Sequence, residues 1–324
     1  MDKIENDIVR VHTLKRILDS NDLGNKRKYL RWNHERARQI IESDYWSPIA
    51  PLFNDRMFER TFRVTKQIAN IILQLAGATD PFFTDRTDGL GKAGICPKTK
   101  ILMGLKLMAY GCSPSAFMDY FQMGETTGRQ CLLRLCIILS SHPDLTSVYL
   151  RSMSRTDAKK VAQLHQEQHG VDGMIGCLDC MHVSWKNCPV AWQGQTSGKE
   201  KKPTIVLEAF TDYNLFFWHA SFGWAGTLND INIWDRSSLL KSFLDGTFSN
   251  DVDFAFKIGD QEFSRLWLLV DGIYPEIPRF VKTIQEPISK NDSTYAKWQE
   301  SSRKSVERAF GVLQRKFHII VKAK

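Results

Sequence analysis

The sequence predicts an α/β protein in which a helical N-terminal half precedes a mixed β-sheet. In the first half, apolar residues recur at helical intervals and are interrupted by glycine and proline. From residue 174 onward they gather in short runs bounded by turn residues, which is the pattern of strands. The chain has 324 residues, 43% hydrophobic and 25% charged, which is an ordinary globular composition with room for two domains. We therefore predict a helical region over 1–170 and a sheet domain over 171–324.

The N-terminal helices begin with a highly charged segment, 1–45. Its basic residues are partly offset by nearby acids, so a solvated helix face explains them better than an arm along a DNA backbone. After a loop, Asn54 stands at the N-cap position of one continuous helix through Leu75. Residues 78–97 carry several glycines and prolines and are predicted to form a loop.

Residues 98–140 contain the outline of a helix-turn-helix. An amphipathic helix is followed by a short helix that begins at Pro114, a turn at Gly124 and another helix as far as Ile138. A short helix, a glycine turn and a helix that begins with polar residues form the arrangement of a DNA-reading helix-turn-helix. A plain helical bundle gives the same pattern, so both interpretations stay open.

The second half changes to the two-residue period of strands. Four strands and two helices are predicted there, in the order Met174–Cys180 (strand), 203–211 (strand), 215–222 (strand), 231–240 (helix), 266–270 (strand) and 301–317 (helix). The second and third strands form a hairpin around a polar turn. Three meandering strands, a crossover helix and a strand parallel to the first make the order of a ribonuclease H-like sheet. The crossover should be right-handed.

Two aspartates end apolar strands of this predicted sheet. Asp179 ends the first strand and Asp271 follows the last. If these strands are neighbours, both carboxylates emerge side by side at one sheet edge, where open α/β sheets place their sites. Glu307 lies at the rim of the apolar stripe of the final helix, and Asp230 at the start of the crossover helix, so either can reach that edge. An exposed glutamate and a capping or first-turn aspartate are the simpler explanations of these two.

Four converging carboxylates suit a particular chemistry. Mg²⁺ and Mn²⁺ prefer oxygen ligands. Two such metals about 3.5–4 Å apart activate water and stabilise the leaving 3′ oxygen of an in-line displacement at phosphorus. Three or four carboxylates converging from separate elements are what such a two-metal site requires, and Asp179, Asp230, Asp271 and Glu307 are the candidates.

The cysteines raise zinc as an alternative metal. Cys177 and Cys180 form a C-x-x-C pair, with His182 and Cys188 nearby. A single pair of this kind is a weak signal, and residues three apart on a strand point to opposite faces. Buried thiols explain these cysteines without any metal.

The charge of the chain favours a polyanionic partner. A net charge of +8 fits phosphate contacts with DNA. Trp185 and Trp192 can stack on a displaced base, although core packing explains them equally well. The basic residues that we predict to contact DNA lie around the acids or on the last helix of the helix-turn-helix: Lys186, Lys199, Lys201, Lys202, Arg129 and Arg303.

The cysteines and the N-terminus bear on the compartment. The seven cysteines show no disulfide spacing, and the charged N-terminus lacks the apolar core of a signal peptide. No run of about 18 apolar residues is present, so no membrane span is expected. These observations predict a reducing, intracellular setting.

Five blocks of the second half resemble one known family, the PIF/Harbinger-type DDE transposases. They run in the family's order and are Gly176–Trp192, Lys202–Ala209, Gly226–Ser237, Leu269–Pro275 and Ser305–Gln314. The helices of the first half resemble the family's helix-turn-helix region more loosely. Agreement over five separate blocks makes the resemblance specific.

The resemblance implies a metal-dependent DNA endonuclease and strand-transfer enzyme. Asp179 matches the family's first acid, Asp271 the second and Glu307 the third, with a spacing between the last two that is typical of many DDE enzymes. Asp230 matches an acid that is sometimes counted as the second member, and we expect it to be a fourth ligand. The family also implies a divalent metal, DNA as substrate, a Myb-like DNA-binding partner protein, a homo-oligomer and a nuclear location.

One departure from the family concerns the C-terminus. The sequence stops at Lys324, whereas family members usually continue into a further helical segment. The resemblance as a whole predicts a transposase that cleaves phosphodiesters at transposon ends and joins the 3′-OH to target DNA. The alternative is a catalytically silent, domesticated or truncated DNA-binding protein derived from a transposase.

Overall fold

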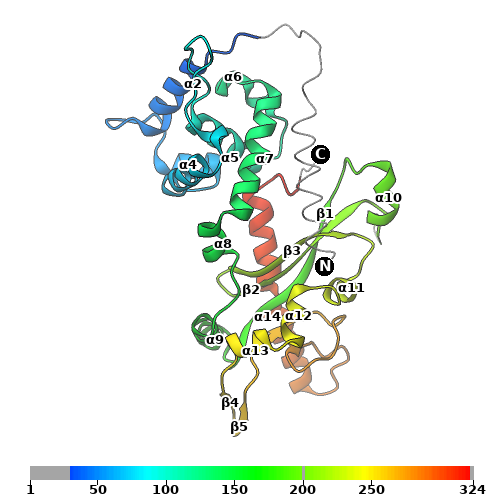
Figure 1. Cartoon of the computed structure of the whole chain (residues 1–324). Helices are drawn as coiled ribbons and strands as arrows, with labels where there is room; N and C mark the ends of the chain where they lie inside the picture. Colours follow the sequence, from blue (N-terminus) through cyan, green and yellow to red (C-terminus); the bar gives the residue numbers. More distant parts are fainter. Residues whose placement is uncertain (1–29, 199–200, 322–324) are drawn as a thin grey trace. The chain divides into compact units, whose positions relative to one another are not determined.

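The structure is a computed structural model that describes residues 30–198 and 201–321 (Figure 1). Much of the charged helix predicted over 1–45 lies outside the described residues, as does Lys199. No helix in the described ranges is long and apolar enough to cross a membrane.

The chain divides into two compact units. One contains the residues up to Leu107 together with Ser113–Ile138, and the other contains Met108–Cys112 and the residues from Leu139 onward. The domain boundary placed near residue 170 stays a prediction.

The first unit is helical, as predicted. Its elements, two of which extend a few residues into the second unit, are α2 (His34–Ile41), a π-helical turn (Glu42–Trp46), α3 (Asp55–Phe62), α4 (Lys66–Thr79), a 3-10 turn (Pro81–Phe83), α5 (Pro97–Tyr110), a second 3-10 turn (Pro114–Phe117), α6 (Met118–Phe121) and α7 (Glu125–Ser141). Buried aromatic rings hold it together: the centroid of Phe58 lies 5.4 Å from that of Tyr45 and 4.7 Å from that of Phe62. Such pairs add to the free energy gained from burying the rings.

The continuous helix predicted from Asn54 to Leu75 is wrong. Arg63 adopts a left-handed conformation, with φ of 63°, and ends α3. The side chain of Thr65 then caps α4 by accepting the N–H of Ile68. A threonine before a helical run is a common N-cap, so the break was readable from the sequence. The helix-turn-helix interpretation of 98–140 stays a prediction.

The second unit holds a β-sheet with helices on both faces (Figure 1). Its elements are α8 (Pro143–Tyr149), α9 (Arg155–His169), β1 (Met174–Ser184), α10 (Val190–Thr196), β2 (Thr204–Thr211), β3 (Phe217–Ala225), α11 (Asp230–Trp234), α12 (Ser238–Leu244), α13 (Thr247–Val252), β4 (Phe256–Ile258), β5 (Gln261–Phe263), β6 (Trp267–Leu269), β7 (Phe280–Val281) and α14 (Lys290–Lys316).

The five-stranded sheet is mixed and has the order β3-β2-β1-β6-β7. Strands β1, β2 and β3 form an antiparallel meander, and β6 lies parallel beside β1, which confirms the pairing predicted for the strands before Asp179 and Asp271. Strand β7 and the separate β4–β5 hairpin were not predicted. The crossover helix predicted over 231–240 is divided between α11 and α12, and α14 begins well before the predicted 301.

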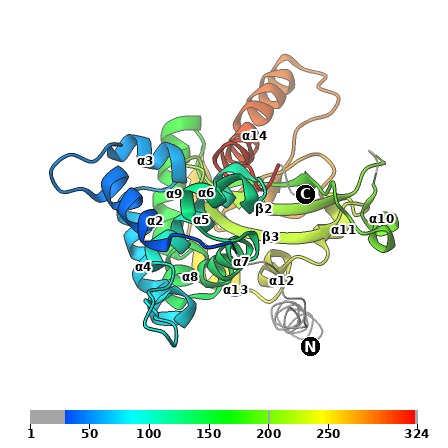
Figure 2. The same ribbon diagram turned by 90° about the horizontal axis from the view of Figure 1, so that it is seen from above.

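Each face of the sheet carries its own apolar layer. On one face, Ile175 and Leu178 of β1 pack with Trp234 of α11 and with residues of α9, α12 and α13. On the other, Cys177 of β1 packs with Val306 of α14. Figure 2 shows α14 on one side of the strands and α12 and α13 on the other. Ile175 and Leu178 share a layer although they are three residues apart, because the register of β1 shifts between Met174 and Gly176. From Cys177 onward the side chains alternate between the two layers.

Candidate active site

Asp179 lies within β1, and Asp271 lies two residues beyond the end of β6, the parallel strand beside it. Strand β1 continues to Ser184, so the prediction that Asp179 ends its strand is wrong. The pairing of β1 with β6 nevertheless ends at Cys177 opposite Leu269, and each aspartate follows two residues later. Because side chains alternate along β1, Asp179 shares the face of Cys177, which α14 covers. The charge of Asp271 acts on Asp179, so the two carboxylates are neighbours.

Asp179 is a buried carboxylate under electrostatic strain. Its side chain is only 14% exposed. Burial raises the pKa of Asp179 to about 6, and the negative charges of Asp230 and Asp271 push in the same direction. A hydrogen bond from the Cys180 backbone N–H, at 2.8 Å, and the charge of Arg303 offset part of this rise. A carboxyl with such a pKa gains from any cation that approaches it.

Arg303 of α14 lies between two of the predicted ligands. One guanidinium nitrogen is 2.9 Å from Asp179 Oδ2, and the other is 3.3 Å from Glu307 Oε1. Arg303 and Glu307 are four residues apart and so share one side of the helix. The guanidinium thus links Glu307, whose side chain is half exposed, to the sheet.

Asp230 is the first residue of α11, whose N-cap is Asn229. Burial raises the pKa of Asp230 above its usual value, and the charges of Asp271 and Glu208 add to the rise. A hydrogen bond with the Cys180 thiol and the charge of His182 act in the opposite direction. Since Cys180 alternates with Asp179 along β1, Asp230 approaches the acids from the other side of the strand.

Sequence reasoning missed one acid, Glu208 of β2. Its side chain is fully buried, and its Oε2 accepts hydrogen bonds from the Ser237 hydroxyl at 2.6 Å and from His219 Nε2 at 2.9 Å. Its Oε1 has no hydrogen-bond partner among the described residues. The charge of Glu208 acts on both Asp230 and Cys180, so it belongs to the same acidic neighbourhood. A single charge within an apolar strand was the signal that could have revealed it.

The candidate acids supply oxygen donors, which bear on whether Mg²⁺ or Mn²⁺ could bind here. Within the described ranges, no three His, Cys, Asp or Glu side chains already stand in position to hold a metal ion. Arg303 lies between Asp179 and Glu307 and forms an ion pair with each of them. The converging groups are carboxylates, which are the donors that Mg²⁺ and Mn²⁺ prefer. The chemistry of these donors therefore suits a hard divalent cation, whereas the described side chains do not yet stand in position around one.

The cysteines do not assemble a zinc site. The Cys177 sulfur lies 3.1 Å from the Ser305 hydroxyl, and the Cys180 sulfur lies 3.5 Å from the Tyr274 hydroxyl. These two thiols face opposite sides of β1. Burial raises the pKa of the Cys177 thiol to about 12, which disfavours the thiolate that zinc requires.

The predicted DNA-contacting residues have different surroundings. Lys186, Lys201 and Lys202 are exposed. Arg129 lies on α7 in the first unit and forms an ion pair with Glu125. Arg303 lies among the acids, as described above.

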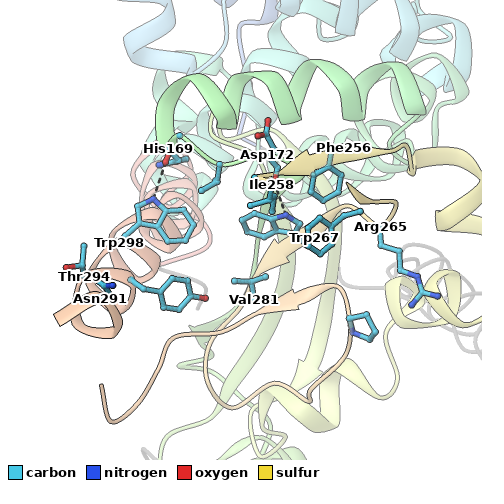
Figure 3. Close-up of a pocket in the computed structure, with 16 residues that line it drawn as sticks. His169, Asp172, Phe256, Ile258, Arg265, Trp267, Val281, Asn291, Thr294 and Trp298 are labelled. Atoms are coloured by element: carbon cyan, nitrogen blue, oxygen red, sulfur yellow. Dashed lines mark hydrogen bonds between the residues drawn. The ribbon is translucent and has the colours of Figure 1, made fainter. Parts of the chain in front are cut away.

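A cavity of about 850 Å³ lies at the opposite end of β6 from Asp271 (Figure 3). Trp267, at the start of β6, and Trp298 of α14 form part of its wall, and their indole N–H groups donate to the carbonyl oxygens of Asp172 and His169. None of the four predicted ligands lines this cavity. It is therefore separate from the acids.

A mixed sheet that gathers carboxylates under a covering helix is consistent with a nuclease-like protein. The model of the plant transposon protein family matches residues 147–324, which is more than half of the chain. The chain therefore belongs to this family. The relatives described next agree with that membership, and the PIF/Harbinger-type, transposase-derived character that the five sequence blocks indicated is confirmed.

Three curated relatives were compared. "Protein ALP1-like" of Arabidopsis thaliana is 22% identical over 274 residues, which are 82% of this chain and 64% of that protein. "Putative nuclease HARBI1" is 24% identical in Bos taurus and 23% identical in Homo sapiens, in each case over 217 residues that make up 66% of this chain and 58% of the relative. The chain thus spans less than two thirds of the length of these relatives. No solved structure matches it.

Proposed function

We propose that the chain is a metal-dependent DNA nuclease of the DDE type, built on a ribonuclease H-like sheet. It cleaves phosphodiesters at transposon ends and joins the freed 3′-OH to target DNA. One observation carries the proposal: Asp179, Asp230 and Asp271 repel one another at one place on the sheet, where a guanidinium cation already links Asp179 to Glu307. Acids held in such opposition are more characteristic of functional sites than of packing.

Each acid has a role in this proposal. Asp179, Asp271 and Glu307 hold the metals, and Asp230 is the fourth ligand. Mg²⁺ or Mn²⁺ bound there supplies water activation and stabilises charge on the leaving 3′ oxygen. The burial of Asp179 keeps water from screening the carboxylates. Arg303, released from its two acids, is well placed to meet a phosphate.

DNA recognition is proposed for both halves of the chain. Lys186, Lys201 and Lys202 are exposed and can contact phosphates beside the catalytic domain, which we assign to 171–324. In the helical region, 1–170, we propose a helix-turn-helix over 98–140 with Arg129 toward DNA. We further propose a homo-oligomer, a Myb-like partner protein and a nuclear location. The names of two relatives support a nuclease.

The proposal is tested first by titrating Mn²⁺ into the purified protein with calorimetry. Wild type should bind saturably, and both Asp179→Asn and Asp271→Asn should abolish binding, because each removes a charged ligand. Mn²⁺-dependent nicking of a supercoiled plasmid should be lost in the same two variants. Asp172→Asn, at the other end of the strands, is the matched control and should retain both properties. Nicking that survives Asp179→Asn unchanged would sink the proposal.

A second candidate function is a transposase-derived DNA-binding protein without catalysis. It is favoured by the absence, among the described side chains, of three His, Cys, Asp or Glu already in position around a metal. Salt-dependent DNA binding together with no Mn²⁺ binding and no nicking in wild type would select it.

A further inference from the structure

Between β1 and β2 the chain forms an arm, residues 185–203, which is far longer than a hairpin needs. Antiparallel neighbours are usually joined by about two to five residues. Here the connection contains α10, and Figures 1 and 2 both show α10 beyond the ends of the strands, on the side of α11. Residues 199–200 of the arm are not described. So long an insertion at the edge of the candidate site calls for a role of its own.

The described part of the arm is folded. Cys188 and Thr196 are buried, with 3.4 Å between the sulfur and the hydroxyl oxygen. The Gln193 side chain donates to the Cys188 carbonyl, and the backbone N–H of Trp185 donates to the Pro203 carbonyl. These bonds close the arm upon itself, so its outer surface is held in one shape.

The arm presents an aromatic ring that its own folding does not cover. Trp185 and Trp192 meet edge to face, with centroids 6.3 Å apart and planes inclined by 69°. Trp192 nevertheless remains 52% exposed, and Val190 beside it is 84% exposed. About half of the Trp192 side chain is left open by its contacts within the arm. That open part is therefore available for stacking.

The arm is fastened to the loop that leads to Asp230. The Thr227 hydroxyl donates to the Gln195 carbonyl at 2.7 Å. Gly198 lies so close to Gly226 that an added Cβ would come within 2.1 Å of the Gly226 carbonyl oxygen, so only glycine fits there. Asp230, the first residue of α11, lies four positions after Gly226 in the sequence. The position of the Trp192 ring is thus coupled to the acids by a short, tightly packed path.

The distance to the acids suits a strand of DNA. Strand β1 runs without interruption from Asp179 to Ser184, and Trp185 follows it. At about 3.3 Å per residue, the tryptophan pair begins about 20 Å from Asp179. Along one strand of a duplex, this span corresponds to about six nucleotides at 3.4 Å each.

Charge complementarity identifies the occupant. Lys186, Lys201 and Lys202 are exposed on the arm. Over 185–203 the sequence has four lysines and one acid, Glu200, which gives a net charge of +3. A basic surface that also offers an open aromatic ring is the combination with which proteins bind single-stranded nucleic acid. An apolar protein surface would use Trp192 and Val190 but would gain nothing from the lysines.

We propose that the described residues of the arm, 185–198 and 201–203, form a base-stacking element. Trp192 stacks on an unpaired base of the DNA whose phosphate lies at the acids, and the lysines contact the neighbouring phosphates. This inference rests on the proposed DNA-cleaving function and adds that the substrate is unpaired near the site. Trp185 is a positioning residue, because its ring supports Trp192 and not the base.

Fluorescence anisotropy with a labelled oligonucleotide tests the arm, with EDTA present to prevent cleavage. The oligonucleotide is used single-stranded and annealed to its complement. Trp192→Leu keeps the apolar contact with Trp185 but removes the aromatic face. It should weaken single-strand binding about tenfold and leave duplex binding nearly unchanged, since stacking acts on unpaired bases. Trp192→Phe should restore most of the affinity.

A second readout reports stacking directly. With 2-aminopurine in the single strand, wild-type protein should quench its fluorescence, and Trp192→Leu should lose that quenching. Tyr149→Leu removes an equally exposed ring from α8 and should change nothing. Lys186→Ala should weaken both forms of DNA alike, as a phosphate contact does.

The outcomes separate the arm from the function on which it rests. If Trp192→Leu binds both DNA forms as wild type does, or loses both equally, the arm is not a base-stacking element, and the first of these results would point to a protein partner. Mn²⁺-dependent nicking by wild type would still uphold the nuclease in that case. If wild type binds neither DNA form and nicks no plasmid, the proposed function and the arm both fall.

Discussion

The two ends of strand β6 differ in how well their polar groups are satisfied. At its start, Trp267 donates its indole N–H to the Asp172 carbonyl, and the cavity beside it has mostly apolar walls. Past its end, Asp271 lies near Asp179. Burial raises the pKa of Asp179 to about 6, and the charges of the neighbouring acids act in the same direction. The difference indicates that the cavity reflects loose apolar packing, whereas the neighbouring carboxylates, which repel one another, identify the candidate active site.

Variants at the two ends of β6 should change different properties: stability at the start of the strand and Mn²⁺ binding past its end. Trp267→Ala removes a buried ring and should lower the free energy of unfolding by about 3 kcal/mol, without changing the Mn²⁺ affinity of the folded protein. Asp271→Asn should do the reverse: it relieves repulsion on Asp179, raises metal-free stability by about 1 kcal/mol and abolishes Mn²⁺ binding. Urea unfolding and calorimetry measure both quantities.

One outcome would contradict the view that the two ends of β6 act independently. If Trp267→Ala also lost Mn²⁺ binding while still folded, the two ends of β6 would act as one site. Trp267→Phe is the control for this comparison, because it keeps a ring in the cavity wall and should cost less stability.

The second prediction uses pH to separate the ends. His165 of α9 is buried, neither ring nitrogen has a hydrogen-bond partner among the described residues, and it stacks on His169, which lines the cavity. Burial lowers the pKa of His165 to about 3, and the charge of His169 adds to the effect. A lowered histidine pKa gives stability that is present above about pH 6.5 and is lost on acidification. From pH 7 to 5, wild type should lose about 2 kcal/mol relative to His165→Phe.

The acid end should respond in the opposite direction. The pKa of Asp179 is raised, so the stability linked to it is present below about pH 4 and is lost as the pH rises through 6 in metal-free protein. Thermal unfolding of Asp179→Asn across the same pH range provides that comparison. Equal pH profiles for wild type and His165→Phe would show that His165 accepts a proton without unfolding.

The sequence allowed the neighbouring acids to be predicted because buried strands leave a strong trace. The runs before Asp179 and Asp271 are continuously apolar, and each gives way to a carboxylate, so their pairing could be inferred. The length of β1 could not, since residues beyond Asp179 alternate like those of an exposed hairpin. Strands of two or three residues, such as β7, are too short to show any period.

The rest of the site depended on contacts between distant parts of the chain. Glu208 could have been noticed as a charge in an apolar strand, but its bonds to His219 and Ser237 required the fold. Arg303 was predicted to contact DNA. The sequence shows its four-residue spacing from Glu307, but it does not show the contact with Asp179. Tertiary placement of a long side chain is not encoded in local spacing.

The smallest expected effect concerns this same arginine. Arg303→Gln removes the cation that stands between Asp179 and Glu307 and leaves the carboxylates to repel one another. Metal-free stability should fall by about 1 kcal/mol, and the affinity for Mn²⁺ should rise about fivefold, because the metal no longer competes with a guanidinium. Calorimetry gives the affinity, and thermal unfolding gives the stability.

Arg308→Gln is the matched control, since Arg308 lies on the same helix and donates to the Tyr213 carbonyl instead of an acid. It should leave the Mn²⁺ affinity unchanged. If Arg303→Gln instead weakened Mn²⁺ binding, Arg303 would be organising the acids for the metal and not standing in its place. The contrast between the two ends of β6 would then need a different explanation, in which the acids are held together by their own protein cation and Glu307 reaches the site only through it.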